Sequence, residues 1–400
     1  MLVDADGHVM EPADVWVDRM DRDRWGDLIP HYLPEDTDGK DSWYVGGVRR
    51  AAGSAIFGCS AGFDPEELLA RPWKYTEGHT AAWDPAARVQ TLDDEGIDAT
   101  VLYPSLALTF GPLDPIPAVR DPEFVADLHR AYNDWIAEFC SYAPHRLYAA
   151  AAVPLQSIDL AVDEARRAVD ELGLHAVFIR SASYFEDVPF SHPRYDPFWA
   201  ACQELGVPIG LHPATHTDLP NAARRFSLVR QSADMAVANK VADEVTGGTA
   251  LSIAVGAPVD AILTLGRLLM GGVCERFPDL KFLVLESGGG WAASLLERMD
   301  EEVEANPQES RWLTMKPSEY FRRQCFISFE PDDPTLPRLA DLIGVDRILW
   351  ASDFPHSDAI YPGTVKALED TIAPLTDDVK DRIRGANAVD AYGLTTDWLG

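Results

Sequence analysis

Residues 175–212 read HAVFIRSASYFEDVPFSHPRYDPFWAACQELGVPIGLH and contain one complete repeat of the fold. The run 175–180 is short and apolar, as is typical of a strand that is covered on both faces. Residues 195–205 carry apolar side chains at helical spacing and are followed by Gly206, a suitable C-terminal cap for a helix. A second apolar run, 207–212, comes next. The stretch therefore predicts a strand, a helix and a second strand parallel to the first.

The same alternation extends along the whole chain. Amphipathic helices, such as 122–142 and 159–172, are predicted between eight short apolar segments that we interpret as strands. The predicted strands are 2–6, 98–103, 146–153, 175–180, 207–212, 280–286, 325–329 and 347–353. Eight units of this kind favour a closed (β/α)8 barrel, the TIM barrel, over an open sheet. We expect one domain over residues 1–400.

Two stretches do not fit the repeat. Residues 12–80 hold many Trp, Pro, Gly and Asp residues without clean periodicity, and residues 214–275 are mostly helical in pattern. Both follow predicted strands, the first and the fifth, so we expect insertions on the face where the strands end. The apolar part of the second insertion, 250–273, is interrupted by Pro258 and Arg267 and is therefore not predicted to cross a membrane. We expect it to be buried in the fold or at the interface of a homo-oligomer, such as a dimer.

The composition excludes some classes of partner. There are 34 Lys and Arg residues against 65 Asp and Glu residues, a formal net charge of −31, which disfavours binding to nucleic acid and to anionic membranes. The five cysteines have no paired spacing and are interpreted as reduced thiols. The N-terminus lacks the basic and apolar regions of a signal peptide. We therefore expect a cytoplasmic protein.

Metal-ligand side chains follow predicted strands that are far apart in the sequence. Asp6 and His8 lie at the first strand, His212 ends the fifth and Asp353 follows the eighth. Because the carboxyl ends of barrel strands meet at one face, these side chains are expected to converge and to bind one divalent metal ion. The mixed ligands suit Zn²⁺ first, with Mn²⁺ and Fe²⁺ as alternatives. The competing interpretation is that Asp6 and His8 belong to an ordinary turn.

Several motifs resemble the amidohydrolase-related family, in the branch that contains aminocarboxymuconate-semialdehyde decarboxylase and γ-resorcylate decarboxylase. The motifs are Asp6-Gly-His8, the helix 87–98, Tyr195-Asp196-Pro197-Phe198-Trp199, His212-Pro213 and Ser352-Asp353-Phe354-Pro355-His356. The resemblance covers nearly the whole chain outside the two insertions. It implies a single metal ion at the mouth of the barrel, with His212 and Asp353 matching the ligands on strands five and eight. The first ligand pair of the family, His-x-His or Glu-x-His, is Asp6-Gly-His8 in this chain.

One position departs from the resemblance. The decarboxylases of the family carry a histidine after strand six, where this chain has Glu286. This difference favours a hydrolase, in which a metal-activated water attacks a small organic substrate. The alternative is a nonoxidative decarboxylase of an aromatic or unsaturated carboxylate. A third hypothesis is a barrel that binds metal without catalysis.

Further residues receive predicted roles at the same face of the barrel. Asp353 is predicted to be the main proton-transfer group, with Glu286 assisting it, positioning substrate or only bonding the glycine turn that follows. Arg180 is predicted to bind a substrate carboxylate or to form a salt bridge at the barrel mouth. His356 is predicted to orient Asp353, to contact substrate or to bond within its loop. Glu11 is predicted to contact substrate or to anchor the first loop.

Overall fold

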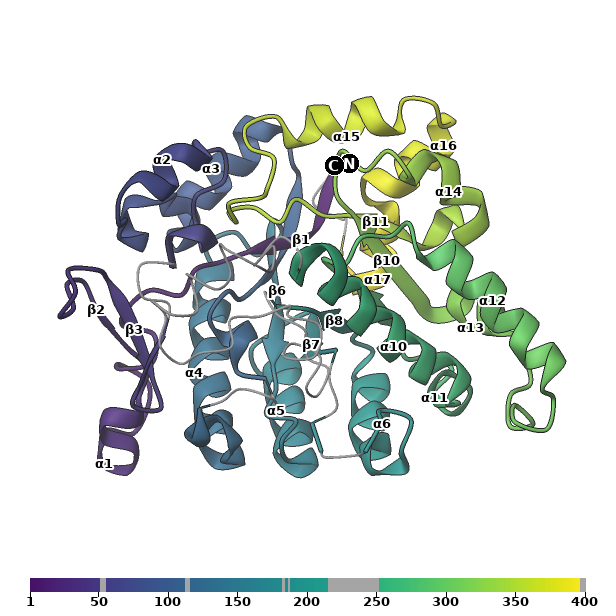
Figure 1. Cartoon of the computed structure of the whole chain (residues 1–400), viewed down its shortest axis with the longest axis horizontal. Coiled ribbons are helices and arrows are strands. Elements are labelled where there is room, and N and C mark those ends of the chain that lie inside the picture. The colour runs from purple at the N-terminus through teal and green to yellow at the C-terminus, as the bar shows by residue number, and fades with distance from the viewer. Residues whose placement is uncertain (51–54, 112–115, 182–183, 186–187, 215–251, 396–400) are drawn as a thin grey trace.

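Eight parallel strands form the centre of the molecule (Figure 1). The structure is a computed structural model, and it describes all residues except 51–54, 112–115, 182–183, 186–187, 215–251 and 396–400. The strands lie in the order β1-β5-β6-β7-β8-β9-β10-β11, so neighbours in this sheet are also consecutive along the chain. They are β1 (Val3–His8), β5 (Ala99–Tyr103), β6 (Leu147–Ala152), β7 (Ala176–Arg180), β8 (Ile209–His212), β9 (Phe282–Val284), β10 (Cys325–Phe329) and β11 (Ile348–Trp350).

Hydrogen bonds join the first strand to the chain just beyond the last. The peptide N–H of His8 donates to Phe354 O at 2.8 Å, and that of Asp353 donates to Asp6 O at 3.0 Å. The side chain of Asp4 adds a bond by accepting from the Ser352 N–H at 2.8 Å. The sheet is thus a nearly closed barrel, as predicted, and β1 and the segment after β11 lie side by side at its mouth.

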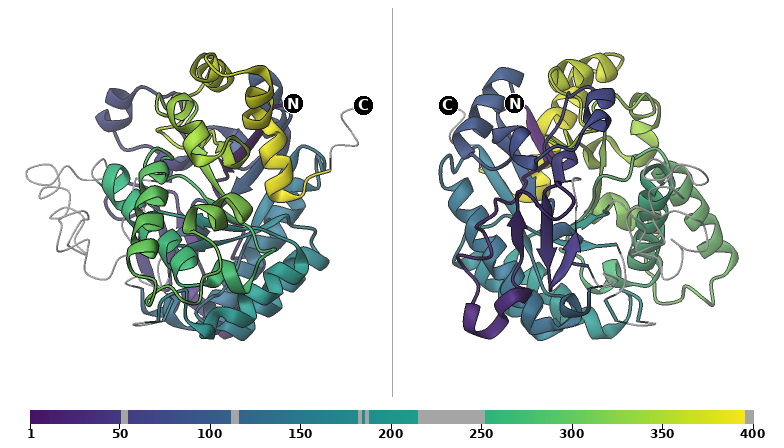
Figure 2. Two further views of the ribbon diagram at one scale, coloured as in Figure 1. Left: turned by 90° about the vertical axis from the view of Figure 1, so that its right-hand side faces the viewer. Right: turned by 60° about the vertical axis from the view of Figure 1, so that its left-hand side comes forward.

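Helices lie around the outside of the strands (Figures 1 and 2). The α-helices are α1 (Arg22–Trp25), α2 (Pro65–Ala70), α3 (Pro85–Glu95), α4 (Pro122–Cys140), α5 (Ile158–Asp170), α6 (Asp196–Leu205), α10 (Ala257–Met270), α11 (Val273–Arg276), α12 (Ala292–Ala305), α13 (Pro317–Gln324), α14 (Leu336–Ile343), α15 (Thr364–Ile372), α16 (Asp377–Asp381) and α17 (Asn387–Tyr392). As predicted, α6 ends at Gly206, whose φ of 69° is the left-handed conformation that glycine adopts without strain. All five cysteines are buried free thiols, as expected.

Two predicted strands end earlier than their apolar patterns suggest. β9 stops at Val284 and β11 at Trp350, because the chain turns into the left-handed region at Glu286, with φ 41°, and at Asp353, with φ 55°. Among the described residues these two are the non-glycine residues with positive φ. Such backbone conformations cost about 1–3 kcal/mol each and concentrate at functional sites.

The first predicted insertion covers one edge of the barrel mouth. It contains α1, α2 and a small antiparallel sheet of β2 (His31–Leu33), β3 (Ser42–Val45) and β4 (Val48–Arg50), which comes forward in the right-hand view of Figure 2. Its later part contacts the loop after β11, since the Ser357 N–H donates to Phe57 O at 2.8 Å and the Ala61 N–H to Pro355 O at 3.0 Å. The insertion therefore reaches the face where the strands end, as expected.

Part of the second predicted insertion, 214–275, belongs to the barrel repeat. Residues 257–276 form α10 and α11, the helical connection between β8 and β9 that belongs to the barrel repeat itself. Ser252–Gly256 form a π-helix, and residues 215–251 lie outside the described residues. α10 buries Leu265, Leu268 and Leu269 completely, so one face of this apolar segment is buried within the fold, while Leu263 is 48% exposed. Over the described ranges, no helix is both long and apolar enough to cross a bilayer. The predicted homo-oligomer stays a prediction.

Candidate metal centre

The end of β1 delivers two side chains to the barrel mouth through a tight piece of backbone. The strand is irregular between Asp4 and Gly7, the residue between Asp6 and His8. A Cβ atom at Gly7 would lie 2.8 Å from Thr100 Oγ1 and 2.9 Å from Asp4 Oδ2, closer than real Cβ atoms approach other atoms. Only glycine fits this position without a shift of its neighbours, which explains the middle residue of the Asp6-Gly-His8 motif.

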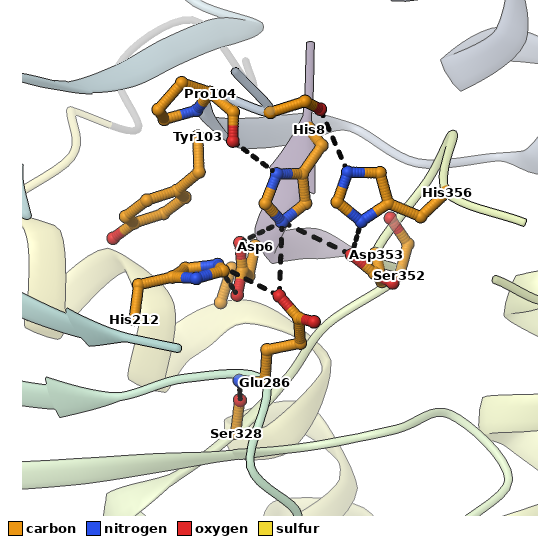
Figure 3. A network of polar contacts seen from close by, with 12 residues as sticks. Asp6, His8, Tyr103, Pro104, His212, Glu286, Ser328, Ser352, Asp353 and His356 are labelled. Carbon is orange, nitrogen blue, oxygen red and sulfur yellow. Dashed lines mark hydrogen bonds and ion pairs between the residues drawn. The ribbon is translucent and has the colours of Figure 1, made fainter. Parts of the chain in front are cut away.

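The four predicted metal ligands lie around His8 Nε2 (Figure 3), in two groups that share His8: one is Asp6, His8 and His212, and the other is His8, Glu286, Asp353 and His356. His8 Nε2 lies 3.5 Å from Asp6 Oδ1 and 3.3 Å from Asp353 Oδ1. His212 Nε2 lies 3.3 Å from Asp6 Oδ2. Asp6 Oδ1 and both Nε2 atoms are buried and have no hydrogen-bond partner in the described part of the chain. Because buried polar atoms are rarely left without a partner, convergent carboxylate and imidazole atoms of this kind fit a divalent cation.

Hydrogen bonds hold the two histidines in the neutral tautomer that a metal ion requires, with the hydrogen on Nδ1. Nδ1 of His8 lies 3.0 Å from Pro104 O, and Nδ1 of His212 lies 2.8 Å from Pro213 O. A carbonyl oxygen can only accept, so each Nδ1 carries the hydrogen and each Nε2 presents its lone pair to the cluster. Burial lowers the pKa of His8 well below its usual value and also lowers the pKa of His212, which keeps both rings neutral.

Glu286 lies in the same cluster. Its Oε2 atom is 3.4 Å from His212 Nε2 and 3.7 Å from His8 Nε2. Its backbone is fixed by a bond from the Glu286 N–H to Ser328 Oγ at 3.2 Å. Burial and the nearby Asp353 carboxylate raise the pKa of Glu286 to about 8. The side chain points toward the ligands in Figure 3, so the predicted alternative of a bond to the following glycine turn does not describe it.

His356 supports Asp353. Its Nδ1 atom lies 2.8 Å from Asp353 Oδ1, and its Nε2 atom lies 3.0 Å from Ser105 Oγ. The ring also stacks on His8, with centroids 4.0 Å apart. Burial disfavours the charged ring, but the Asp353 carboxylate outweighs burial and raises the pKa of His356 to about 9. Both ring nitrogens are engaged, which agrees with the predicted role of His356 in orienting Asp353, while its contact with substrate stays a prediction.

Glu11 is an anchor and not part of the cluster. Its two carboxylate oxygens accept the peptide N–H groups of Leu106, at 2.8 Å, and Ala107, at 2.7 Å. The residue is completely buried, and burial raises its pKa to about 7. Glu11 therefore ties the loop after β1 to the loop after β5, and the prediction of a substrate contact is corrected to the anchoring alternative.

Arg180 lies at the predicted place. It is the last residue of β7 and is paired in register with His212. Its buried guanidinium donates from Nη1 to Leu108 O at 2.9 Å, and its positive charge contributes to lowering the pKa of His212. The position at the mouth is as expected, while contact with a substrate carboxylate stays a prediction.

Sequence reasoning missed two residues that hold the site together. Arg88, on α3, is buried and donates to Phe354 O at 3.2 Å and also to the carbonyl oxygen of His8. It thereby joins the ends of two ligand-bearing segments. Ser105 is the second residue beyond β5. Like His212, it is a polar residue at the carboxyl end of a barrel strand, and this position was the signal that could have identified it. No pattern around Arg88 distinguishes it from a surface arginine of an amphipathic helix.

The family model for amidohydrolases matches residues 3–394. The chain belongs to this family. Among relatives, 2-amino-3-carboxymuconate-6-semialdehyde decarboxylase of Dictyostelium discoideum is 24% identical over 322 residues, which is 80% of this chain and 79% of that protein. γ-Resorcylate decarboxylase of Rhodococcus jostii (strain RHA1) is 26% identical over 321 residues, 75% of this chain and 84% of that protein. The predicted family is confirmed.

Solved structures share the fold. An amidohydrolase from Mycobacterium avium subsp. paratuberculosis K-10 superposes with a TM-score of 0.76 at 23% identity, covering 98% of this chain and 99% of the other. A dihydroxybenzoic acid decarboxylase from Polaromonas sp. JS666, with bound manganese and the inhibitor 2-nitroresorcinol, gives a TM-score of 0.63 at 20% identity and covers 98% and 97%. These similarities confirm the amidohydrolase-type barrel.

Proposed function

We propose that the protein is a metal-dependent nonoxidative decarboxylase that acts on an aromatic or unsaturated carboxylate. The observation that carries this proposal is the similarity, over 75–80% of the chain, to two relatives that are both decarboxylases. From the sequence we favoured a hydrolase, because Glu286 replaces the histidine after strand six. We give this similarity more weight than the single position of Glu286, because it extends over 322 and 321 residues.

Asp6, His8, His212 and Asp353 would hold the divalent cation. When bound, the cation supplies positive charge that holds and polarises oxygen atoms of the substrate. The sequence suggested Zn²⁺ first, but the oxygen-rich ligand set suits Mn²⁺ better. The manganese in the Polaromonas decarboxylase supports the same choice. We therefore propose Mn²⁺, with Zn²⁺ and Fe²⁺ as alternatives.

Asp353 is proposed as the proton-transfer group. Its side chain is 19% exposed, so it faces both the ligand cluster and the open mouth of the barrel. Burial raises the pKa of Asp353 to about 7, although His356 opposes this, so the carboxylate takes up a proton more readily than that of an exposed aspartate. In the reaction the bond between carbon and the carboxylate breaks, CO₂ leaves and the electron pair stays on carbon. The proton of Asp353 then forms the new C–H bond, and solvent returns a proton to Asp353.

Arg180 is proposed to hold an anionic group of the substrate. It ends β7 directly beside His212, and a guanidinium binds a carboxylate through two parallel hydrogen bonds. A substrate held there would present its other oxygen atoms to the ligand cluster. Arg180→Lys is expected to raise KM more than it lowers kcat, because lysine keeps the charge but loses the planar pair of donors.

The test is a substrate screen in D₂O with the Mn²⁺-loaded protein. Dihydroxybenzoates and unsaturated carboxylates are expected to release CO₂, with one deuterium on the carbon that lost the carboxylate. Metal-stripped protein and Asp353→Asn serve as controls and should show no turnover. The same screen includes lactones, aryl esters and amides in H₂¹⁸O. Release of ¹⁸O-labelled acid from these, without CO₂ from any carboxylate, would contradict decarboxylation and favour the hydrolase.

A further inference from the structure

The sequence predicts a proton-transfer role for Glu286, but its position favours another one. We propose that Glu286 is a fifth ligand of the divalent cation, through Oε2, and that it adapts the site to Mn²⁺. This assignment concerns the metal ion and not the reaction. It can therefore fail while the proposed decarboxylation holds, and the reverse is also true.

The distances place Glu286 among the ligands. Its Oε2 atom lies 3.4 Å from His212 Nε2 and 3.7 Å from His8 Nε2, each 0.1–0.2 Å longer than the distances of Asp6 from the same two atoms, 3.3 and 3.5 Å. Two donors that each lie about 2.1 Å from one cation are about 3.0 Å apart at a right angle and about 3.6 Å apart at 120°. The distances of Glu286 Oε2 from the two imidazole nitrogens are therefore those expected between two ligands of the same cation. A side chain that only supports a ligand would lie farther from the other ligand atoms.

The backbone supports the same conclusion. Glu286 and Asp353 share the left-handed conformation, with φ of 41° and 55°, and both direct a carboxylate at His8 Nε2. Strain of this kind is kept where an interaction compensates for it. Within the described residues, Glu286 contacts the protein through the bond from its N–H to Ser328 Oγ and through the approach of its carboxylate to the two imidazoles. A cation at this point would bring the three carboxylates and the two lone pairs together without repulsion.

The ligand count favours Mn²⁺. With Glu286 the site offers three carboxylates and two neutral imidazoles, five donors in all. Protein sites for Zn²⁺ usually have three or four protein ligands in a tetrahedral arrangement, whereas carboxylate-rich sites suit Mn²⁺. Three carboxylates and one divalent cation carry a net charge of −1, which makes the cation a weaker electron acceptor than it would be with the two carboxylates of Asp6 and Asp353 alone.

The test compares metal affinities of the full-length protein after the metal has been removed. Mn²⁺ binding is measured from the electron paramagnetic resonance signal of free Mn²⁺, and Zn²⁺ binding by competition with a chromophoric chelator. Glu286→Gln keeps the size of the side chain, and we expect Mn²⁺ affinity to fall at least about tenfold. Zn²⁺ affinity should fall less, because Asp6, His8, His212 and Asp353 can still bind it.

Glu330→Gln is the matched control. Glu330 follows β10, the strand beside β9, and within the described residues it is not among the groups that could hold a metal ion. This variant should bind Mn²⁺ as the wild type does. Anomalous diffraction from crystals of the Mn²⁺-loaded wild type gives a second measurement that does not depend on a variant folding. Unchanged Mn²⁺ affinity in Glu286→Gln, or a manganese peak more than about 3 Å from both Glu286 carboxylate oxygens, would overturn the proposal.

Discussion

Replacing His356 with phenylalanine removes the support of Asp353 but keeps an aromatic ring against His8. In the structure the two imidazole rings stack with centroids 4.0 Å apart, and a phenyl ring can occupy the same place. The variant loses the contact of Nδ1 with Asp353 Oδ1, at 2.8 Å, and that of Nε2 with Ser105 Oγ, at 3.0 Å. We expect His356→Phe to fold and to bind its metal ion more weakly.

The size of the loss follows from these contacts. Groups that orient a metal ligand usually contribute about 10–100-fold in affinity, or about 1.4–2.7 kcal/mol. A hydrogen bond to a charged group contributes about 1.5–3 kcal/mol. The Asp353 side chain is 19% exposed, so water screens part of this interaction and places the effect in the lower half of both ranges. We expect a loss of about 1.5–2 kcal/mol, which is about 10–30-fold in affinity.

The variant Ser105→Ala distinguishes the contribution of the contact between His356 and Ser105 from that of the contact between His356 and Asp353. It removes the hydroxyl that contacts His356 Nε2 and that donates to Val9 O at 2.7 Å, and it leaves the contact between His356 and Asp353 in place. One such hydrogen bond contributes about 0.5–1 kcal/mol, so a loss of about threefold is expected. Mn²⁺ titrations of the three metal-stripped proteins, with melting temperatures as a check on folding, measure both effects. The reasoning is refuted by wild-type affinity in His356→Phe, or by a larger loss in Ser105→Ala.

Four further predictions concern stability. Burial lowers the pKa of His129 to about 3 from 6.5, so below pH 6.5 the unfolded chain takes up a proton that the folded chain excludes. Stability should therefore fall by about 2 kcal/mol between pH 7 and pH 5 from this residue, and His129→Leu should remove that part of the loss in urea unfolding. Gly7→Ala should cost about 1–3 kcal/mol and reduce bound metal, because its Cβ would lie 2.8 Å from Thr100 Oγ1. Gly266→Ala, in α10 with nothing within 4 Å of the added atom, should be neutral or stabilising by thermal denaturation. Chelation should lower stability by about 2.7 kcal/mol relative to protein in metal at 100 times its dissociation constant.

The sequence by itself determined the barrel and brought together four predicted ligands of the candidate metal centre. Short apolar strands, helices with a glycine cap such as Gly206, and a regular alternation between them are local patterns, so they can be read without knowing the packing. Asp6, His8, His212 and Asp353 could be grouped because every strand of a parallel barrel ends at the same face. That rule needs only the strand boundaries.

Only the tertiary structure decided how individual side chains are used at that face. Glu286 and Asp353 leave the strand conformation, so the apolar pattern placed the strand ends too late and gave no direction for either carboxylate. Besides Asp353, His356 contacts Ser105 in the loop after β5, and the oxygens of Glu11 accept peptide N–H groups of the same loop. Such pairings depend on which atoms meet across the barrel, and spacing along the chain carries no information about that meeting.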